Sequence, residues 1–387
     1  MKKIIALSTE IGRGHPNYLD GLIKVLSQKT NQSIPFFSVF DLSRRASKFA
    51  WNAVHRLYRF GSQGGISTIA YNLIRSQRSE NRRLIALLGR DLRNCFKGFR
   101  GLCLVEHPVV ARILRNCCSI YYIHGEVAAP PSSAVYSADK IFVPLEYTRK
   151  RFIEHNVSPS CLSVTGLMIE PELITTAKDS FHKRLERLRS NPILNIGFFT
   201  SGAYPFEHIE KILKAIISLK GKRPILFAGY DWTKLNLLKR KLIKAGFQIN
   251  YDSDNSENGF KGGDITVVYR SDRIKDTGRA VGLIPTIDIF VAAAHERTNW
   301  ALGLGIPMFV LYPMIGPFAR ENFDFAQNSG VIYSLDSLEK ARKFREIVDR
   351  LRSDGTLIKM AQNGFGKYPI DGFEKTAVEI INDLDSS

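Results

Sequence analysis

The chain has 387 residues, of which 44% are hydrophobic and 24% are charged, so it can fill the cores of two ordinary domains and is not a disordered chain. Its formal net charge of +18 calls for an acidic partner: nucleic acid, an anionic membrane surface or a phosphorylated substrate. Five cysteines without a Cys-x-x-Cys pair favour reduced thiols in a cytosolic protein, and no apolar run approaches the roughly 20 residues of a membrane span.

Short apolar runs alternate with amphipathic stretches along the chain. A first series of expected strands covers 3–8, 34–40, 102–105, 119–123, 140–143 and 161–165. A second series covers 193–199, 224–228, 247–250, 264–269, 287–292, 307–311 and 330–333. Helical patterns lie between many of them, at 206–219, 232–245, 297–304, 319–328 and 336–352. Strands that are apolar throughout and alternate with helices predict parallel sheets covered on both faces.

The two series of strands predict two doubly wound α/β domains, one over 1–170 and one over 193–370. The polar, basic stretch 171–192 is the expected linker between them. A last helix within 371–387 follows a proline and is a candidate to return to the first domain.

The region 42–116 holds much of the positive charge. It carries 15 Lys and Arg against three acidic residues, so its net +12 is two thirds of the total of +18. We expect an insertion of basic helices over 42–100. Segment 46–60 interleaves aromatic and basic side chains, a pattern typical of helices that lie on anionic membranes. A half-buried helix with a solvated outer face is the alternative.

The stretch LSTEIGRGHPNYLDGL, residues 7–22, follows the first strand. Gly12 and Gly14 permit a tight turn, and Pro16 suits the first turn of a helix. His15 then stands at the carboxyl end of the strand, where open α/β sheets bind ligands and where a histidine can take a proton near neutral pH. A tight turn with a capping histidine is the alternative, and the missing third glycine disfavours a dinucleotide site.

The "GRGH" of this stretch resembles the glycine-rich loop of GT-B fold glycosyltransferases that act on lipid acceptors. These are the monogalactosyldiacylglycerol synthases, the bacterial diacylglycerol glucosyltransferases and the N-acetylglucosaminyltransferase of lipid II assembly. Further segments resemble that family in the same order: 105–114, 138–173, 225–242, 287–316 and 321–333. The resemblance implies two Rossmann-like domains that face a central cleft, with the acceptor on the first domain and the nucleotide-sugar on the second.

Carried onto this sequence, the resemblance implies an acceptor side and a catalytic base. Gly12 and Gly14 would face the acceptor, and His15 and His107 are the candidate catalytic residues. His124 and Glu126 follow another strand and are expected to line the acceptor side. A histidine with satisfied hydrogen bonds and a purely structural role is the alternative for His124.

The resemblance also implies a donor site on the second domain, with a departure from the family pattern. The expected donor-binding residues are Ser201, Gly202, Arg270, His295, Glu296, Arg297, Thr298, Asn299 and Glu321. The family has a ribose-binding glutamate seven residues before the proline that here is Pro307, but this chain has Trp300 there, and the loop lacks glycines. A degenerate or repurposed loop is therefore the alternative to an active donor site.

The function expected from the resemblance is that of an inverting glycosyltransferase. It would move a sugar from a nucleotide-diphosphate-sugar, a UDP-sugar first, to a lipid-linked or other membrane-associated acceptor. We expect no metal or other cofactor and no nucleic-acid partner, and a cytoplasmic protein bound peripherally to an anionic membrane. The alternatives are a GT-B-like epimerase, a polyol-phosphate transferase, and a non-catalytic binding protein of the same fold.

Overall fold

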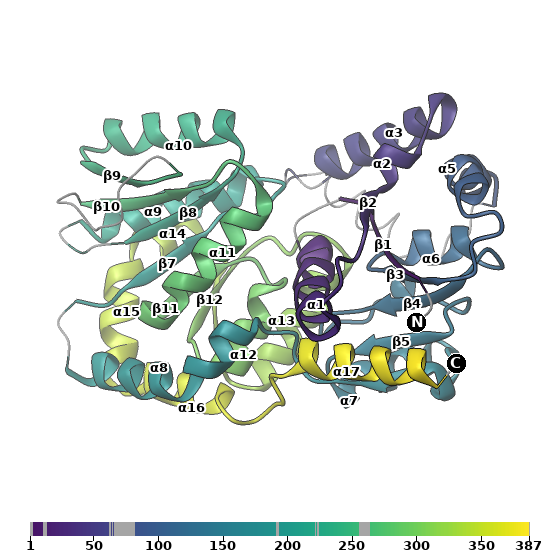
Figure 1. Cartoon of the computed structure of the whole chain (residues 1–387). Coiled ribbons are helices and arrows are strands. Elements are labelled where there is room, and N and C mark those ends of the chain that lie inside the picture. Colours follow the sequence, from purple (N-terminus) through teal and green to yellow (C-terminus); the bar gives the residue numbers. More distant parts are fainter. Residues whose placement is uncertain are drawn as a thin grey trace. The chain divides into compact units, whose positions relative to one another are not determined.

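The computed structural model describes residues 3–10, 14–61, 63, 65, 82–190, 193–220, 222, 224–254 and 264–386. The chain forms two compact units (Figure 1). The first unit comprises Met1–Pro171, Gly316–Glu321 and Pro369–Ser387, and the second comprises Glu172–Ile315 and Asn322–Tyr368. Each unit has its own parallel sheet and its own hydrophobic core.

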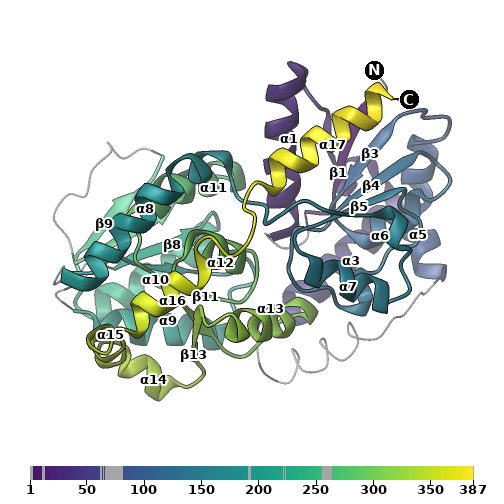
Figure 2. The same cartoon turned by 90° about the horizontal axis from the view of Figure 1, so that it is seen from below.

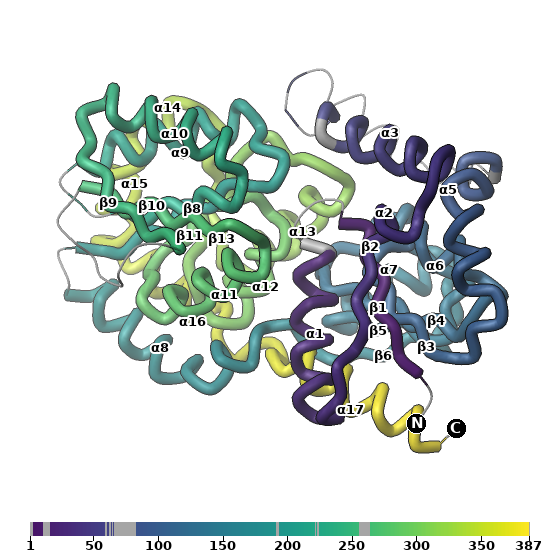
Figure 3. The backbone as a smooth tube through the Cα atoms, turned by 45° about the horizontal axis from the view of Figure 1, so that its top comes forward, coloured from purple at the N-terminus to yellow at the C-terminus, as the bar shows by residue number. Residues whose placement is uncertain are grey.

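The described part of the first unit is built on a parallel sheet in the order β2-β1-β3-β4-β5-β6. Its strands are β1 (Ile4–Ser8), β2 (Phe36–Ser38), β3 (Leu102–Val105), β4 (Ser119–Ile123), β5 (Lys140–Val143) and β6 (Leu162–Val164). The chain begins inside the sheet and adds β2 on one side and β3 on the other (Figure 3). The strand order therefore reverses between β1 and β3.

Helices cover both faces of this sheet, because successive side chains of a strand point to opposite faces. Ala6 and Leu104 pack with α1 (Gly14–Thr30) and α17 (Gly372–Asp385). Leu7 and Val105 belong to the core on the other face. The helices of that face are α2 (Val39–Leu42), α3 (Arg45–Gly61), α5 (Arg82–Cys95), α6 (Pro108–Leu114) and α7 (Glu146–Glu154).

The last helix, α17, packs against α1 within the first unit (Figure 2). Gly21 makes the contact possible, because a Cβ at this position would lie 2.4 Å from the Phe373 ring. Lys140 Nζ lies 2.6 Å from Asp383 Oδ2, and the Tyr121 hydroxyl donates to the same carboxylate oxygen at 2.8 Å. The C-terminal segment thus ends on the sheet in which the chain began.

The described part of the second unit has a parallel sheet in the order β13-β12-β11-β7-β8-β10-β9. Its strands are β7 (Ile196–Phe199), β8 (Ile225–Gly229), β9 (Ile249–Asp252), β10 (Ile265–Tyr269), β11 (Ile289–Ala292), β12 (Met308–Leu311) and β13 (Ile332–Leu335). Its helices are α8 (Pro171–Ser190), α9 (Phe206–Ser218), α10 (Trp232–Lys244), α11 (Arg273–Leu283), α12 (Arg297–Leu304), α14 (Leu338–Arg342), α15 (Phe344–Ser353) and α16 (Thr356–Gly364). One further helix, α13 (Pro317–Asn328), begins in the first unit and ends in the second. The strand order reverses at β7, between β8 and β11.

The stretch 171–192, which we expected to be a linker, is instead occupied by the helix α8 as far as Ser190. Although α8 is mostly polar, Phe181, Leu185 and Leu188 recur at helical spacing and form one apolar face. This face packs into the core of the second unit. Arg184 lies on the same buried face and donates to the carbonyl oxygens of Ile287 and Leu304, both at 2.9 Å. A basic residue therefore serves as part of the core here.

Candidate functional site

The first candidate position lies at the carboxyl ends of β1 and β3. Ligands of open parallel sheets bind where the strand order reverses, and in the first unit this place is between β1 and β3. The register pairs Leu7 with Val105, which brings Ser8 beside Glu106. Of the expected loop residues, Gly12 lies outside the described residues, Gly14 opens α1, and the side chain of His15 also lies outside the description.

Glu106 is a fully buried carboxyl at this position. Its Oε1 accepts hydrogen bonds from the Ser8 hydroxyl at 2.9 Å, from the Thr9 backbone N–H at 2.9 Å and from the Thr9 hydroxyl at 3.2 Å. Its Oε2 is buried and has no hydrogen-bond partner in the described part of the chain. Burial raises the pKa of Glu106 to about 7, although these hydrogen bonds oppose the rise. The group can therefore hold or release a proton near neutral pH.

His107 follows directly and caps the next helix. Its Nδ1 accepts a hydrogen bond from the backbone N–H of Val109 at 3.2 Å, at the start of α6. Acceptance at Nδ1 leaves the proton of the neutral ring on Nε2. The ring is 7% exposed, so its place beside Glu106 is fixed by the helix start.

His124 is held on both of its ring nitrogens. Nδ1 lies 3.1 Å from the Tyr122 hydroxyl, and Nε2 lies 2.9 Å from the carbonyl oxygen of Ala128. Burial lowers the pKa of His124 to about 4, so the ring is neutral. The structure thus gives this residue a structural position: it fixes the turn that carries Glu126, whose side chain is 4% exposed.

Glu321, the last of the expected donor residues, is held by groups of the first unit. Its Oε1 accepts from Arg151 Nε at 2.9 Å and from the Tyr147 hydroxyl at 3.1 Å, and its Oε2 accepts from the backbone N–H of Ala129 at 3.2 Å. All four residues belong to the first unit. Both carboxylate oxygens are therefore engaged by groups that are far away in the sequence.

The second candidate position lies at the carboxyl ends of β7 and β11, where the strand order of the second unit reverses. The register pairs Phe198 with Val291, so the residues that follow β7 and β11 lie near each other. Ser201 follows β7, and its buried hydroxyl oxygen has no hydrogen-bond partner in the described ranges. The same holds for the hydroxyl of Thr298, in the first turn of α12. Two hydroxyls are thus available at this edge.

Arg297, the first residue of α12, is the charged group of this edge. Its guanidinium carbon lies 4.1 Å from the centroid of the Trp300 ring and 5.0 Å from that of Phe199. The residue is 8% exposed, and its guanidinium forms no hydrogen bond or ion pair with any other described residue. The guanidinium thus lies over two aromatic rings, which offer no acceptor for its N–H groups, so these groups are left to bind an anion. Trp300, which stood out in the sequence, forms one side of this clamp.

The other expected donor residues are arranged around this edge or away from it. Burial lowers the pKa of His295. Glu296 precedes α12, but its side chain does not cap the helix. Asn299 is buried in the first turn of α12. Gly202 is exposed, and its carbonyl oxygen accepts from Lys234 Nζ at 3.0 Å. Arg270 does not join Ser201, Arg297 and Thr298. Its guanidinium pairs instead with Asp252 at the end of β9.

Reasoning from the sequence missed two residues with chemical potential, Glu106 and His208. His208 lies on α9, donates from Nε2 to the carbonyl oxygen of Pro313 at 2.8 Å, and has no partner for Nδ1 within the described residues. Burial lowers the pKa of His208 to about 4, and the nearby His295 adds to the effect. An acid directly after a buried strand was the available signal for Glu106, whereas nothing in the sequence distinguishes His208.

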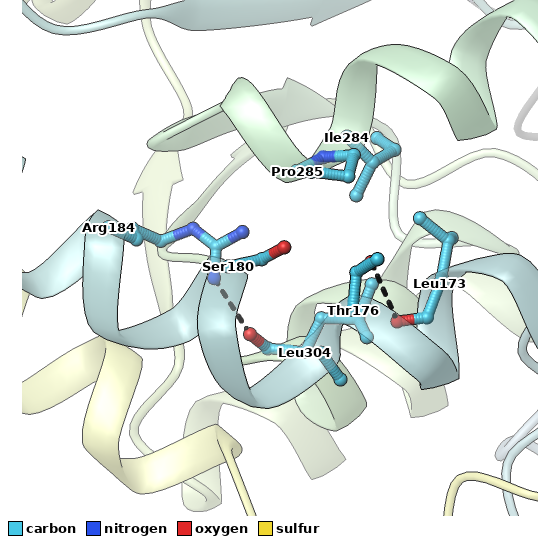
Figure 4. Close-up of a pocket in the computed structure, with 8 residues that line it drawn as sticks. Leu173, Thr176, Ser180, Arg184, Ile284, Pro285 and Leu304 are labelled. Carbon is cyan, nitrogen blue, oxygen red and sulfur yellow. Dashed lines mark hydrogen bonds between the residues drawn. The ribbon is translucent and has the colours of Figure 1, made fainter.

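One small cavity of the second unit is not a ligand site. It lies between α8 and the η3 turn (Ile284–Thr286), and Arg184 and Ser180 from α8 border it (Figure 4). Its volume of about 10 Å³ is the space of one water molecule. In the described ranges no three His, Cys, Asp or Glu side chains are grouped to hold a metal ion, and no helix there is long and apolar enough to span a membrane.

Known structures share the fold of both units. No protein-family model matches the sequence, and no curated protein matches it. The UDP-GlcNAc 2-epimerase of Neisseria meningitidis bound to UDP-GlcNAc is similar with a TM-score of 0.58 and 12% identity, over 100% of each chain. MurG of Acinetobacter baumannii is similar with a TM-score of 0.56 and 10% identity, over 99% of this chain and 100% of the other. S. aureus MnaA in complex with UDP is similar with a TM-score of 0.57 and 12% identity, over 99% of this chain and 96% of the other.

At these identities the comparisons establish the fold. The chain is an α/β protein with two parallel Rossmann-like sheets and a GT-B-like architecture. The fold class expected from the sequence is confirmed. The resemblance noted in the sequence is confirmed at the level of this fold, which both the epimerases and MurG share.

Proposed function

We propose that this chain is an enzyme that acts on a nucleotide-diphosphate sugar, with UDP-sugars as the first candidates. The observation that carries the proposal is Arg297: a buried guanidinium in cation–π contact with two rings, without a hydrogen-bond or ion-pair partner among the described residues. A buried cation without a partner is costly, and a diphosphate supplies both the charge and the acceptor oxygens. Similar structures solved with UDP-GlcNAc or UDP support this choice of ligand.

Three further features of the same edge favour a diphosphate over a single carboxylate. The Ser201 and Thr298 hydroxyls are donors without a partner in the described chain, so a ligand with several acceptor oxygens satisfies more than one group. The N-terminal end of α12 also favours negative charge through the helix dipole, although the backbone N–H groups of Thr298 and Asn299 already donate to the carbonyl oxygens of His295 and Glu296. We expect His295 to orient this turn and Asn299 to bind beside it, with ribose as the neighbouring part of the ligand.

For the reaction, epimerisation of the sugar is the first candidate. Inverting a C–H centre removes a proton from carbon and returns one to the opposite face, so the enzyme needs groups that both accept and donate protons. Glu106 has a pKa of about 7 and is therefore populated in both protonation states at neutral pH. The similarity to a UDP-GlcNAc 2-epimerase favours this reaction further. Glu106 is the residue we assign to the proton transfer, with Glu126 as a second acid on the same unit.

Sugar transfer to a membrane-associated acceptor is the second candidate. It is favoured by the likeness to MurG and by the exposed aromatic residues Phe49 and Phe60 on the basic helix α3. In this version His15 removes the proton of the acceptor hydroxyl, with Gly12 and Gly14 beside the acceptor. His107 would then orient the base rather than react.

One experiment tests ligand binding and then distinguishes the two reactions. The melting temperature is measured with UDP-GlcNAc, UDP-glucose and UDP; a ligand at about 100 times its Kd stabilises the folded protein by about 2.7 kcal/mol, a shift of several degrees. The sugar is then incubated in D₂O and followed by proton NMR. Epimerisation places deuterium on the inverted carbon without any acceptor, whereas transfer releases UDP only when an acceptor is supplied.

Two variants keep the test specific. Arg297→Met retains the stem between the rings and removes the donors, so it should lose the ligand-induced shift. Arg345→Met, at an exposed arginine of α15, is the matched control and should keep it. If none of the three ligands raises the melting temperature, or if Arg297→Met responds like the unaltered protein, the proposed function is wrong.

A further inference from the structure

The helix α3 has apolar side chains on two adjacent faces, an inner one that is buried and an outer one that is exposed. The inner face carries Ala50 and Trp51, which are 5% and 1% exposed and belong to the core of the first unit. Two hydrogen bonds fix this face to α5: Ser47 Oγ donates to the carbonyl oxygen of Leu87 at 2.8 Å, and Trp51 Nε1 donates to that of Leu88 at 3.1 Å. The orientation of α3 is therefore set by the core, and its outer face cannot turn inward.

The outer face of α3 holds large apolar side chains that the described protein leaves uncovered. Phe49 is 73% exposed, Phe60 is 62% exposed and Leu57 is 53% exposed. At about 100° of rotation per residue, these three positions lie within an arc of about 80°. They therefore form one stripe along a helix that is roughly 25 Å long. Burial of the inner face does not explain this stripe.

Basic side chains border the apolar stripe on one side. Arg45, Lys48 and Arg56 are exposed and form no ion pair with any described residue. From Arg44 to Gly61 the sequence has five Lys and Arg and no acidic residue. By the same rotation Arg56 and Arg45 stand within about 40° of the stripe and Lys48 about 100° from it, on the same side, where their long side chains can reach anionic groups.

We propose that α3 is a membrane-docking helix that lies flat on an anionic lipid bilayer, with Phe49, Leu57 and Phe60 in the headgroup boundary. Aromatic rings flanked by cations suit the interface, where apolar area is buried while the charges meet lipid phosphates. A second copy of this chain fits less well, because both surfaces carry the same positive charge and the whole chain has a net +18. The proposal does not depend on the proposed function.

The test is flotation of the full chain with vesicles of phosphatidylcholine alone and of an equimolar mixture with phosphatidylglycerol. We expect binding to the mixed vesicles, weaker binding at high salt, and little binding to phosphatidylcholine. The double variant Phe49→Ser with Phe60→Ser should lower the partition coefficient by at least about tenfold, because two rings lose their insertion. Arg45→Glu with Arg56→Glu should lower it by a similar factor on the mixed vesicles only.

Phe206→Ser is the matched control, since this phenylalanine on α9 is 63% exposed, nearly the same as Phe60. It should bind the vesicles like the unaltered chain. The altered residues are exposed, so each variant should keep its melting temperature, which is measured alongside. The proposal is overturned if the chain does not float with the mixed vesicles, or if the Phe49→Ser, Phe60→Ser variant floats as well as the control. It is also overturned if the serine and glutamate substitutions abolish binding to a DNA duplex while vesicle binding is unaffected.

Discussion

Replacing Glu106 by glutamine should change how the stability of the first unit depends on pH. The carboxyl has a pKa of about 7 in the folded chain because it is buried, against 4.5 for an exposed glutamate. Between these values the folded state holds the proton and the unfolded state has lost it. The free energy of unfolding therefore falls by about 1.4 kcal/mol for each pH unit as the pH rises through this window. The 2.5-unit difference corresponds to about 3 kcal/mol in total.

Glu106→Gln cannot ionise, but its amide oxygen can still accept from Ser8 and Thr9. Its stability relative to the unaltered chain should therefore be higher at pH 8 than at pH 4 by about 3 kcal/mol. Hydrogen exchange measured by mass spectrometry on peptides from β1 and β3 reports the opening of the first unit separately from the second. The exposed Glu154, replaced by glutamine, is the control for the loss of one acidic side chain. An equal stability difference at both pH values would mean that Glu106 has an ordinary pKa and would refute its assignment as an acid–base group.

Three other substitutions test particular contacts. Gly125→Ala should destabilise the first unit by about 1–3 kcal/mol in thermal unfolding, because the new Cβ would lie 2.3 Å from the Tyr18 ring. Gly278→Ala is the control and should not be destabilised in this way, because no atom lies within 4 Å of its new Cβ. Arg184→Met should lower the stability of the second unit by about 2 kcal/mol, since it leaves two buried carbonyl groups without a donor; an unchanged melting temperature would contradict this. Trp300→Leu should weaken UDP binding by about three- to tenfold in calorimetry through loss of one side of the arginine clamp, and undiminished affinity would argue against the clamp.

Much of the fold follows from local patterns in the sequence. Runs such as 102–105 and 308–311 are apolar throughout, as strands buried on both faces must be, and each expected strand region overlaps a strand. The pattern fails where polar residues conceal a buried face. In α8 the charged residues outnumber the apolar ones, and only the spacing of Phe181, Leu185 and Leu188 reveals its packing. In β2 the apolar run 34–40 is cut short, because Ser38 caps α2 by accepting from the Phe40 backbone N–H.

The candidate site could be predicted only where its residues are close in sequence. Arg297 and Thr298 open a helix after a short loop that follows a strand, so their position was accessible. The clamp around Arg297 was not, since Phe199 comes from β7, about a hundred residues earlier. Glu106 looks like an ordinary acid after a strand, and its burial and unpartnered oxygen arise only from folding. The partners of Glu321 could not be predicted either, since Arg151 and Ala129 come from 170 and 192 residues earlier in the chain.

The most direct test of the account is a calorimetric titration of UDP-GlcNAc into the full chain and into Arg297→Met. The account predicts binding at one site per chain, with an affinity that falls by at least about tenfold in the variant, because the diphosphate loses its charged donors. Equal affinity in the two proteins, or no binding to either, would contradict it.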